Sequence, residues 1–413
     1  MRTYEAISAD FNYDEAKIVP YTLPDPLVLS DGARVKNAAE WLGFQRGEIL
    51  DLLKKEEYGE IPPRPDSMRF ETLTVRNDAL GDTAVRKEIR LHFGMNNGKT
   101  HHFDMLLYIP KHAECPAPAF LGLNFKGNHA TTGEEDVAET GFSSPGELVF
   151  QDARGAQSER WSFREVIARG YASATVCYHD IYPDFKDKTS ESVFGMLFPE
   201  AEHASLPRNY TPIGAWAWGL SRALDCLEAE TSVDSSRVAV HGHSRLGKTS
   251  LWAGAVDSRF KLVIANCSGC GGAALHKRKI GENVEALISH GCADWFVTAF
   301  HRYSGKEELM PFDQHELLAL IAPRALCLGT ATLDIDSDPM GEFLAAVHAS
   351  EIYALFGGAG LPAVAMPPSD VNITGSISFH CRTGKHNQTL QDWLHYLDAA
   401  DTYLRPRKNV LTF

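Results

Sequence analysis

A serine, an acid and a histidine follow one another along this chain in the order used by one large class of serine hydrolases. Ser244 stands just after an apolar run, Asp334 follows a later apolar run, and His386 lies near the C-terminus. Nucleophile, acid and histidine keep this chain order where a parallel sheet presents them at one edge. A serine needs such a base before it can attack an ester carbonyl. The order therefore predicts an esterase.

The segment around Ser244 matches two incompatible motifs. From Gly242, the letters GHSRLGKT satisfy the phosphate-binding pattern G-x-x-x-x-G-K-[ST] of nucleotide hydrolases. With the apolar run 237–241 in front of them, the same letters form a nucleophile elbow, a sharp turn with the serine at its apex. The elbow is imperfect, because two residues separate Ser244 from Gly247 where the usual pattern has one.

The flanking residues favour the elbow. A phosphate loop is usually followed by a strand that ends in an acid near Mg²⁺, but the apolar run 261–265 ends in Asn266. The elbow instead requires an acid after a later strand and then a histidine, and the chain has both. We therefore prefer an esterase to a nucleotide hydrolase.

Three carboxylates compete for the role of the acid. Asp334, Asp336 and Asp338 all follow the apolar run 324–330, and Asp334 is preferred because it is nearest to the end of that run. It would fix the tautomer of the histidine and stabilise the imidazolium. The other two are expected to be solvated loop carboxylates, with Asp338 also suited to a turn.

His386 is the preferred base and His380 its competitor. His386 lies in the loop GKHN, which can bring an imidazole to the C-terminal edge of a parallel sheet, where such sheets bind ligands. The oxyanion that forms on attack needs donors. Backbone N–H groups at the turn around Ser244 can supply them, and the guanidinium of Arg245 can reach the same oxygen.

The charge of the chain limits its partners. A formal net charge of −14 argues against nucleic acid and against an anionic membrane, because both require a basic surface. The same field would repel an acidic sugar, so a substrate of that kind requires a locally basic pocket. No apolar run of about 18 residues is present that could span a bilayer. The oligomeric state is left open.

The first residues, MRTYEAISADFNYDEAK, lack the basic end and apolar stretch of a secretory signal. If Met1 is the native start, we expect a cytoplasmic enzyme that acts on imported fragments. If it is not, we expect a secreted or periplasmic enzyme that meets cell-wall material.

The chain has eight cysteines, of which only Cys267 and Cys270 form a C-x-x-C pair. A zinc site of this kind would need a second pair. We expect buried free thiols and no metal.

The N-terminal residues 1–65 are predicted to form an arm packed on a catalytic domain of residues 66–413. A helix at 38–57 would turn Leu42, Ile49, Leu52 and Leu53 to one side. The arm is too small for a core of its own.

The remaining pattern is that of an α/β fold. Alternating segments at 69–75, 88–93 and 103–110 predict antiparallel strands at one edge of a sheet. Continuous apolar runs separated by helical stretches predict a parallel sheet that is covered on both faces. These runs are 117–124, 171–178, 237–241, 262–266 and 324–330. Trp216 and Trp218 are expected in a core helix behind the elbow.

Six motifs together resemble the glucuronoyl esterases, carbohydrate esterase family 15, in their bacterial branch. They are NFKGNH (124–129), GHSRLGK (242–248), SGCGGAAL (268–275), GEN (281–283), LIAPRAL (320–326) and DPMGEF (338–343). The resemblance covers roughly residues 100–405. It implies an α/β-hydrolase sandwich without metal or organic cofactor. It also implies cleavage of the ester between 4-O-methyl-glucuronic acid on xylan and a lignin alcohol.

The resemblance assigns roles to particular residues. It makes Ser244 the nucleophile, His386 the base and Arg245 the side chain that stabilises the oxyanion. It also implies that Lys248 and Glu282 bind sugar hydroxyls. Trp295 is a further candidate, because an indole ring can stack on a sugar ring.

Two departures from the family pattern bear on function. Cys267 stands where many members carry the catalytic Glu, although Asp334 matches the position that other bacterial members use. Asp336 stands where many members have a Trp that packs on the uronic ring, so it becomes a substrate-contacting candidate that disfavours an anionic sugar. Two alternatives follow, namely an acetyl xylan or oligosaccharide esterase and a catalytically impaired carbohydrate-binding relative.

Overall fold

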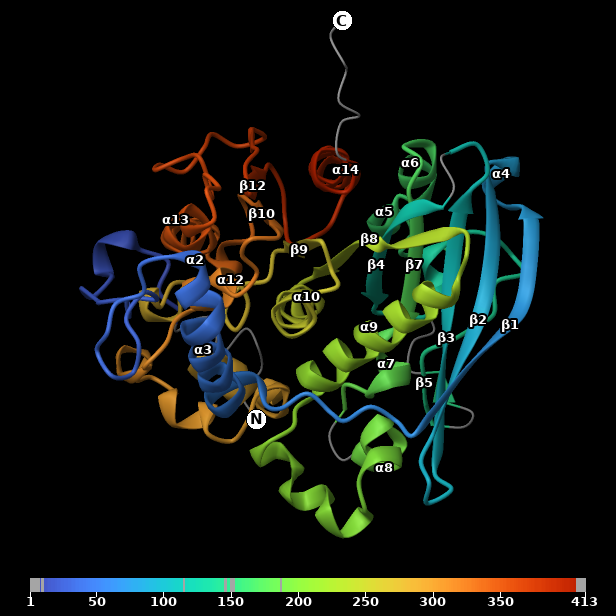
Figure 1. Cartoon of the computed structure of the whole chain (residues 1–413), viewed down its shortest axis with the longest axis horizontal. Helices are drawn as coiled ribbons and strands as arrows, with labels where there is room; N and C mark the ends of the chain where they lie inside the picture. Colours follow the sequence, from blue (N-terminus) through green and yellow to red (C-terminus); the bar gives the residue numbers. More distant parts are fainter. Residues whose placement is uncertain are drawn as a thin grey trace, which may run out of the picture.

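A sheet of ten strands forms the centre of the molecule, in the order β1-β2-β3-β7-β4-β8-β9-β10-β12-β11 (Figure 1). The computed structural model describes residues 8, 11–113, 116–144, 147–148, 153–185 and 188–405. The strands of this sheet are β1 (Ser67–Asp78), β2 (Ala84–Gly94), β3 (Thr100–Pro110), β4 (Ala117–Asn124), β7 (Ala172–Cys177), β8 (Val233–His243), β9 (Leu262–Asn266), β10 (Ala325–Ala331), β11 (Asn372–Ile373) and β12 (Ile377–Arg382). A separate pair is formed by β5 (Phe142–Ser144) and β6 (Glu147–Leu148).

The direction of the strands confirms the predicted fold class. Strands β1, β2, β3 and β7 are antiparallel neighbours at one edge, whereas β7, β4, β8, β9, β10 and β12 run parallel. The parallel strands β4, β7, β9 and β10 are buried at every residue, because helices cover both faces. The short β11 pairs antiparallel with β12 at the other edge. The C-terminal pair β11 and β12 had no sequence prediction.

Helices cover both faces of the sheet. Figure 1 shows α6 (Phe163–Ala168) and α14 (Leu390–Tyr403) on one side, and α9 (Pro212–Ala229) and α10 (Arg245–Val256) on the other. Trp216 and Trp218 of α9 are fully buried, as predicted. The other helices are α2 (Ala38–Glu40), α3 (Arg46–Leu53), α4 (Ala79–Asp82), α5 (Ser158–Trp161), α7 (Tyr178–Ile181), α8 (Val193–Leu197), α11 (Val284–Leu287), α12 (Gln314–Ala319) and α13 (Pro339–Leu355). No helix in these described ranges is both long and apolar enough to cross a membrane.

The N-terminal helix is present, but its buried face differs from the prediction. The helical stretch from α2 to Tyr58 includes two π-type turns, Trp41–Gln45 and Lys54–Tyr58. A π turn holds more residues than an α turn, so the buried stripe recurs every four residues. Trp41, Gln45, Ile49 and Leu53 are therefore buried in sequence, whereas Leu42 is 55% exposed.

Residues 11–65 contribute to the main core and have no separate core of their own. Trp41, Ile49, Leu53 and Tyr58 belong to the same buried cluster as the helices α9 and α10. The Tyr58 ring stacks on Trp252 of α10 at 4.7 Å between ring centroids. We propose that residues 1–65 form an arm that packs on the catalytic domain, residues 66–413. This arm would help to hold α10, the helix that follows Ser244.

Truncating the buried Trp41 should destabilise the protein far more than truncating its exposed neighbour Leu42. Trp41→Ala should lower the free energy of unfolding by about 3–5 kcal/mol, because it leaves a cavity in the core. The control, Leu42→Ala, should change it by less than about 0.5 kcal/mol. Urea unfolding of both variants measures the difference. An equal loss in the two variants would contradict the assignment of the buried face.

Candidate active site

Ser244 occupies a strained turn between β8 and α10. Its backbone has φ 58° and ψ −130°, a region that side-chain-bearing residues rarely adopt. The Ser244 N–H donates to the carbonyl of Asn266 on the neighbouring strand at 2.8 Å, which anchors the turn to the sheet. A Cβ on Gly242 would lie 1.9 Å from the carbonyl oxygen of Leu246, so the turn can close only over a glycine. This is the geometry of a nucleophile elbow.

The same turn lacks the features of a phosphate loop. The N–H groups of Gly247 and Lys248 donate to the carbonyl of Ser244, at 2.8 and 3.1 Å, as in an ordinary first helical turn. Lys248 is only 4% exposed, and its Nζ donates to the carbonyl of Ser268 at 2.6 Å. A phosphate loop needs these donors directed at a ligand. The nucleotide-hydrolase interpretation therefore has no support in the geometry.

His386 and Asp334 form a hydrogen-bonded pair at the same edge of the sheet. Nδ1 of His386 lies 2.8 Å from Oδ2 of Asp334. Burial alone would raise the pKa of Asp334, but the hydrogen bond and charge of His386 outweigh it and lower that pKa. An ionised Asp334 keeps a proton on Nδ1 and leaves Nε2 to accept one. The preferred histidine and the preferred acid thus meet in space.

The competing histidine lies elsewhere. His380 is fully buried within β12, and its Nε2 lies 2.8 Å from Oδ1 of Asp392 on α14. Asp392 also accepts a hydrogen bond from Nε of Arg382 at 2.8 Å. This group ties α14 to the sheet and does not line the hollow described below.

The other two carboxylates after β10 have different partners. Asp338 is not solvated as predicted, because it is buried and ion-paired with Arg278, with 2.9 Å between Oδ2 and Nε. It also caps α13 by accepting from the N–H of Gly341, which agrees with the expected turn. Asp336 is partly exposed and accepts a hydrogen bond from the Tyr13 hydroxyl at 2.6 Å.

A hollow of about 420 Å³ opens over Ser244 and His386. Its wall contains three basic side chains, Lys126, Arg160 and Arg245. The acidic chain therefore holds the locally basic pocket that an acidic sugar would require. Lys126 and Arg160 had no predicted role, although Lys126 belongs to the NFKGNH motif directly after β4.

Arg245 is held by a residue that the sequence analysis missed. Its guanidinium pairs with the Asp184 carboxylate and lies 4.6 Å from the centre of the Trp295 ring. The indole N–H of Trp295 donates to the same carboxylate at 2.7 Å, and the Tyr178 hydroxyl donates at 3.2 Å. Trp295 is thus buried behind Arg245, and its role as a platform for a sugar remains a prediction.

Lys248, Glu282 and Asp336 form a connected group. The Lys248 ammonium lies 3.9 Å from the Glu282 carboxylate, and the Glu282 N–H donates to the Asp336 carbonyl at 2.9 Å. Burial raises the pKa of Glu282, while the charges of Lys248, His386 and Arg245 act against that rise. The Glu282 carboxylate is therefore close enough to His386 and Arg245 for their charges to act on it.

A buried carboxylate supports the loop that begins at Cys267. Oε1 of Glu342 accepts hydrogen bonds from the Ser268 hydroxyl at 3.1 Å and from the Gly269 N–H at 2.7 Å. Burial raises the pKa of Glu342 to about 8, even though these hydrogen bonds lower it. The nearby charge of Asp334 adds to the rise. Glu342 lies in the DPMGEF motif, but nothing in its spacing indicated this contact.

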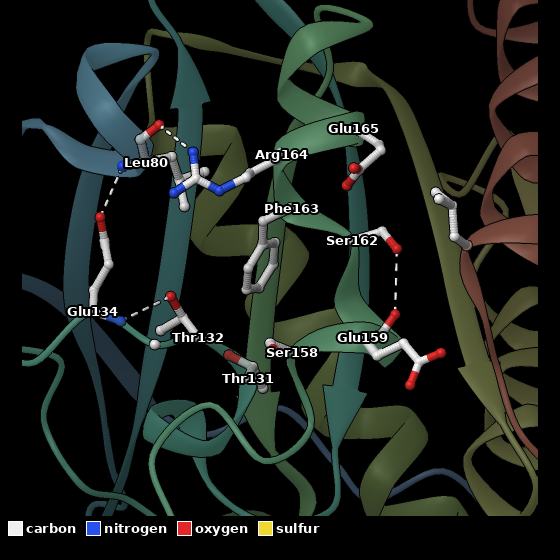
Figure 2. A pocket seen from close by; sticks show the side chains of 12 residues that line it. Leu80, Thr131, Thr132, Glu134, Ser158, Glu159, Ser162, Phe163, Arg164 and Glu165 are labelled. Carbon is white, nitrogen blue, oxygen red and sulfur yellow. Dashed lines mark hydrogen bonds between the residues drawn. The ribbon is translucent and has the colours of Figure 1, made fainter.

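A second hollow of about 570 Å³ lies beside α5 and α6 (Figure 2). Two of its charged side chains, Arg164 and Glu134, make backbone contacts. Arg164 donates to the carbonyl of Leu80 at 2.8 Å, and Glu134 accepts from the Leu80 N–H at 2.8 Å. Neither Ser244 nor His386 lines it. We therefore place the chemistry in the smaller hollow.

The parallel sheet, the strained serine after β8 and the Asp–His pair define an α/β-hydrolase of the serine esterase class. A family model described as "Glucuronyl esterase, fungi" matches residues 165–357. The carbohydrate esterase MZ0003, from an unknown prokaryotic organism, is 41% identical over 402 residues, which cover 95% of this chain and 92% of that relative. The chain belongs to carbohydrate esterase family 15, the glucuronoyl esterases, and is a carboxylic ester hydrolase.

Two solved structures show the same relationship. A promiscuous family 15 esterase from a marine bacterial metagenome has 40% identity and a TM-score of 0.86, covering 95% of this chain and 99% of its own. A glucuronoyl esterase from Solibacter usitatus has 39% identity and a TM-score of 0.87, covering 94% and 99%.

Glu342 should make stability depend on pH. Its folded pKa of about 8 lies above the ordinary 4.5, so its stabilising contribution is full below pH 4.5 and is lost as pH rises through about 8. Glu342→Gln cannot ionise, so its free energy of unfolding relative to the wild type should rise between pH 5 and 8 and then level off. Urea unfolding across this range measures it, with the exposed Glu165→Gln as control. A difference that is constant with pH would refute the assignment.

Proposed function

We propose that this enzyme hydrolyses esters of glucuronic acid or its 4-O-methyl form, such as those that link glucuronoxylan to lignin alcohols. The observation that carries the proposal is the basic hollow over Ser244 and His386 in an otherwise acidic protein. Three basic side chains and one carboxylate, Asp184, line this hollow, and a basic wall of this kind suits an acidic sugar product. The relationship to enzymes described as glucuronoyl esterases supports the same substrate class.

In the proposed first step, Ser244 Oγ attacks the ester carbonyl and passes its proton to Nε2 of His386. Asp334 accepts the Nδ1 hydrogen bond at 2.8 Å and stabilises the imidazolium that forms. His386 then protonates the leaving alcohol, and the uronic acyl group remains on Ser244. Water attacks this acyl enzyme with His386 again as the base, which releases the free acid and restores the serine.

The negative charge that develops on the carbonyl oxygen requires donors that are already in place. The N–H groups of Gly247 and Lys248 donate to the Ser244 carbonyl, so the two before them, of Arg245 and Leu246, are the backbone groups of α10 that can point toward that oxygen. Arg245 supplies a second donor from the same wall of the hollow. The Asp184 carboxylate and the Trp295 ring hold its guanidinium, so little reorganisation is needed during the reaction.

In this proposal, Lys126 and Arg160 attract the acidic sugar, and the Lys248–Glu282 pair binds its hydroxyls. The Trp295 ring contacts the Arg245 guanidinium, which lines the hollow. Asp336, partly exposed after β10, would discriminate against a second negative charge. Substrates of this class occur in plant cell-wall material. The enzyme would therefore act on wall polymers outside the cell or on fragments after import.

Acetyl ester hydrolysis is a second candidate function. The related marine family 15 esterase is described as promiscuous, which favours a broader range of esters. Asp336, partly exposed after β10, also suits a neutral acetylated sugar better than a charged one. A catalytically impaired, carbohydrate-binding role is the remaining alternative, and it predicts that the Asp334–His386 pair has no effect on rate.

Substrate preference is tested with benzyl D-glucuronate and an acetylated xylo-oligosaccharide. The wild type should release uronic acid from the benzyl ester with the higher kcat/KM, because the wall of the hollow is basic. Ser244→Ala should reduce both activities to the background rate, because the nucleophile is gone. A strong preference for the acetyl substrate would support the second candidate. Activity retained by Ser244→Ala would contradict the mechanism.

Asp334→Asn tests the triad. The amide can no longer orient an Nδ1–H donor or stabilise the imidazolium, so kcat on benzyl D-glucuronate should fall by about 10³–10⁴-fold. Asp336→Asn makes the same chemical change two residues away and should alter KM while kcat stays within about tenfold. Steady-state kinetics separates the two effects. An unchanged rate in Asp334→Asn would favour the impaired relative.

A further inference from the structure

Cys267 brings a third kind of ligand to the Asp334–His386 pair. The thiol, the carboxylate and the imidazole each offer a ligand atom, and these atoms all lie within 4.8 Å of one another. Cys267 follows β9, and its N–H donates to the carbonyl of Gly329 on β10 at 2.7 Å. This hydrogen bond holds the thiol at the sheet edge from which Asp334 also projects.

The three groups are the ligand types that zinc prefers. Zinc takes thiolate sulfur at about 2.3 Å and imidazole nitrogen or carboxylate oxygen at about 2.0–2.2 Å, in a tetrahedron. Neighbouring ligand atoms in such a tetrahedron lie roughly 3.4 Å apart. The observed spread of up to 4.8 Å therefore needs only small side-chain rotations. Mg²⁺ and Ca²⁺ select oxygen ligands and do not match this set.

We propose that Cys267, Asp334 and His386 form a binding site for a soft divalent cation such as Zn²⁺, and that the bound cation switches the esterase off. The inhibitory half of this inference rests on the proposed function. A cation on Nδ1 leaves the ring proton on Nε2, and a cation on Nε2 occupies that nitrogen directly. In either case, His386 cannot accept the proton of Ser244. The thiol loses its proton to solvent as the sulfur binds.

The site can be reached from the hollow. The side chain of His386 is 42% exposed, whereas Asp334 and Cys267 are buried beneath it. A cation can meet the imidazole first, and the fourth coordination position can face the hollow. The other thiol of the C-x-x-C pair belongs to a different group, because Sγ of Cys270 lies 3.4 Å from Nδ1 of the buried His276.

The test compares wild type, Cys267→Ser and Cys270→Ser in metal-free buffer. Zn²⁺ should inhibit hydrolysis of benzyl D-glucuronate by the wild type and by Cys270→Ser, and a chelator should restore activity. Cys267→Ser should need at least about tenfold more Zn²⁺ for the same inhibition, because it loses the soft ligand. Mg²⁺ at the same concentrations should have no effect. Cys267→Ala is the second variant if the serine variant does not fold.

A measurement of metal binding that does not depend on activity distinguishes failure of the metal site from failure of the proposed esterase function. One equivalent of Cd²⁺ should produce the ultraviolet charge-transfer absorption of a cadmium–thiolate bond in the wild type and in Cys270→Ser, and not in Cys267→Ser. If this absorption appears but glucuronate esters are not hydrolysed, the metal site stands and the proposed function fails. Equal Zn²⁺ inhibition of wild type and Cys267→Ser, or no thiolate absorption in the wild type, would overturn the inference.

Discussion

The backbone of Ser244 is the constraint on which the rest of the site depends. A side-chain-bearing residue at φ 58° and ψ −130° is strained by about 1–3 kcal/mol and persists only where the surroundings enforce it. Here residues 238–243 of β8 and 246–255 of α10 are buried, Gly242 allows the turn to close, and the Asn266 carbonyl holds the Ser244 N–H. The N-terminal arm contributes through the contact of Tyr58 with Trp252 on α10.

The second organising feature is the separation of charge within an acidic protein. Three basic side chains meet in one hollow, namely Lys126 after β4, Arg160 of α5 and Arg245 at the elbow. The net charge of the whole chain is −14. Arg245 would be a poor oxyanion donor if it moved freely, since ordering a long side chain costs conformational entropy. Asp184 and Trp295 remove that freedom in the resting enzyme. The hollow therefore combines attraction for an anion with fixed donors.

The residues after β9 and β10 show how one edge of a parallel sheet gathers groups from neighbouring strands around one imidazole. Carboxyl ends of adjacent parallel strands meet there, so an acid after β10 can reach the same imidazole as a residue after β9. Asp334 occupies the first of these places and Cys267 the second. The Cys267 thiol therefore lies beside the same imidazole that Asp334 binds, and the Asp–His hydrogen bond is formed in its presence.

The sequence alone determined the fold class, the elbow and the chain order of Ser244, Asp334 and His386, because apolar runs and turn residues report local burial and backbone geometry. Tertiary structure decided what depends on strand order and side-chain direction. It placed His386 beside Ser244 and His380 against Asp392. It also buried Trp41 in place of Leu42, and it brought Lys126, Arg160 and Asp184 to the hollow over the serine. These residues are far apart along the chain. No local pattern encodes their distance, since contacts across a sheet edge arise only when the strands assemble.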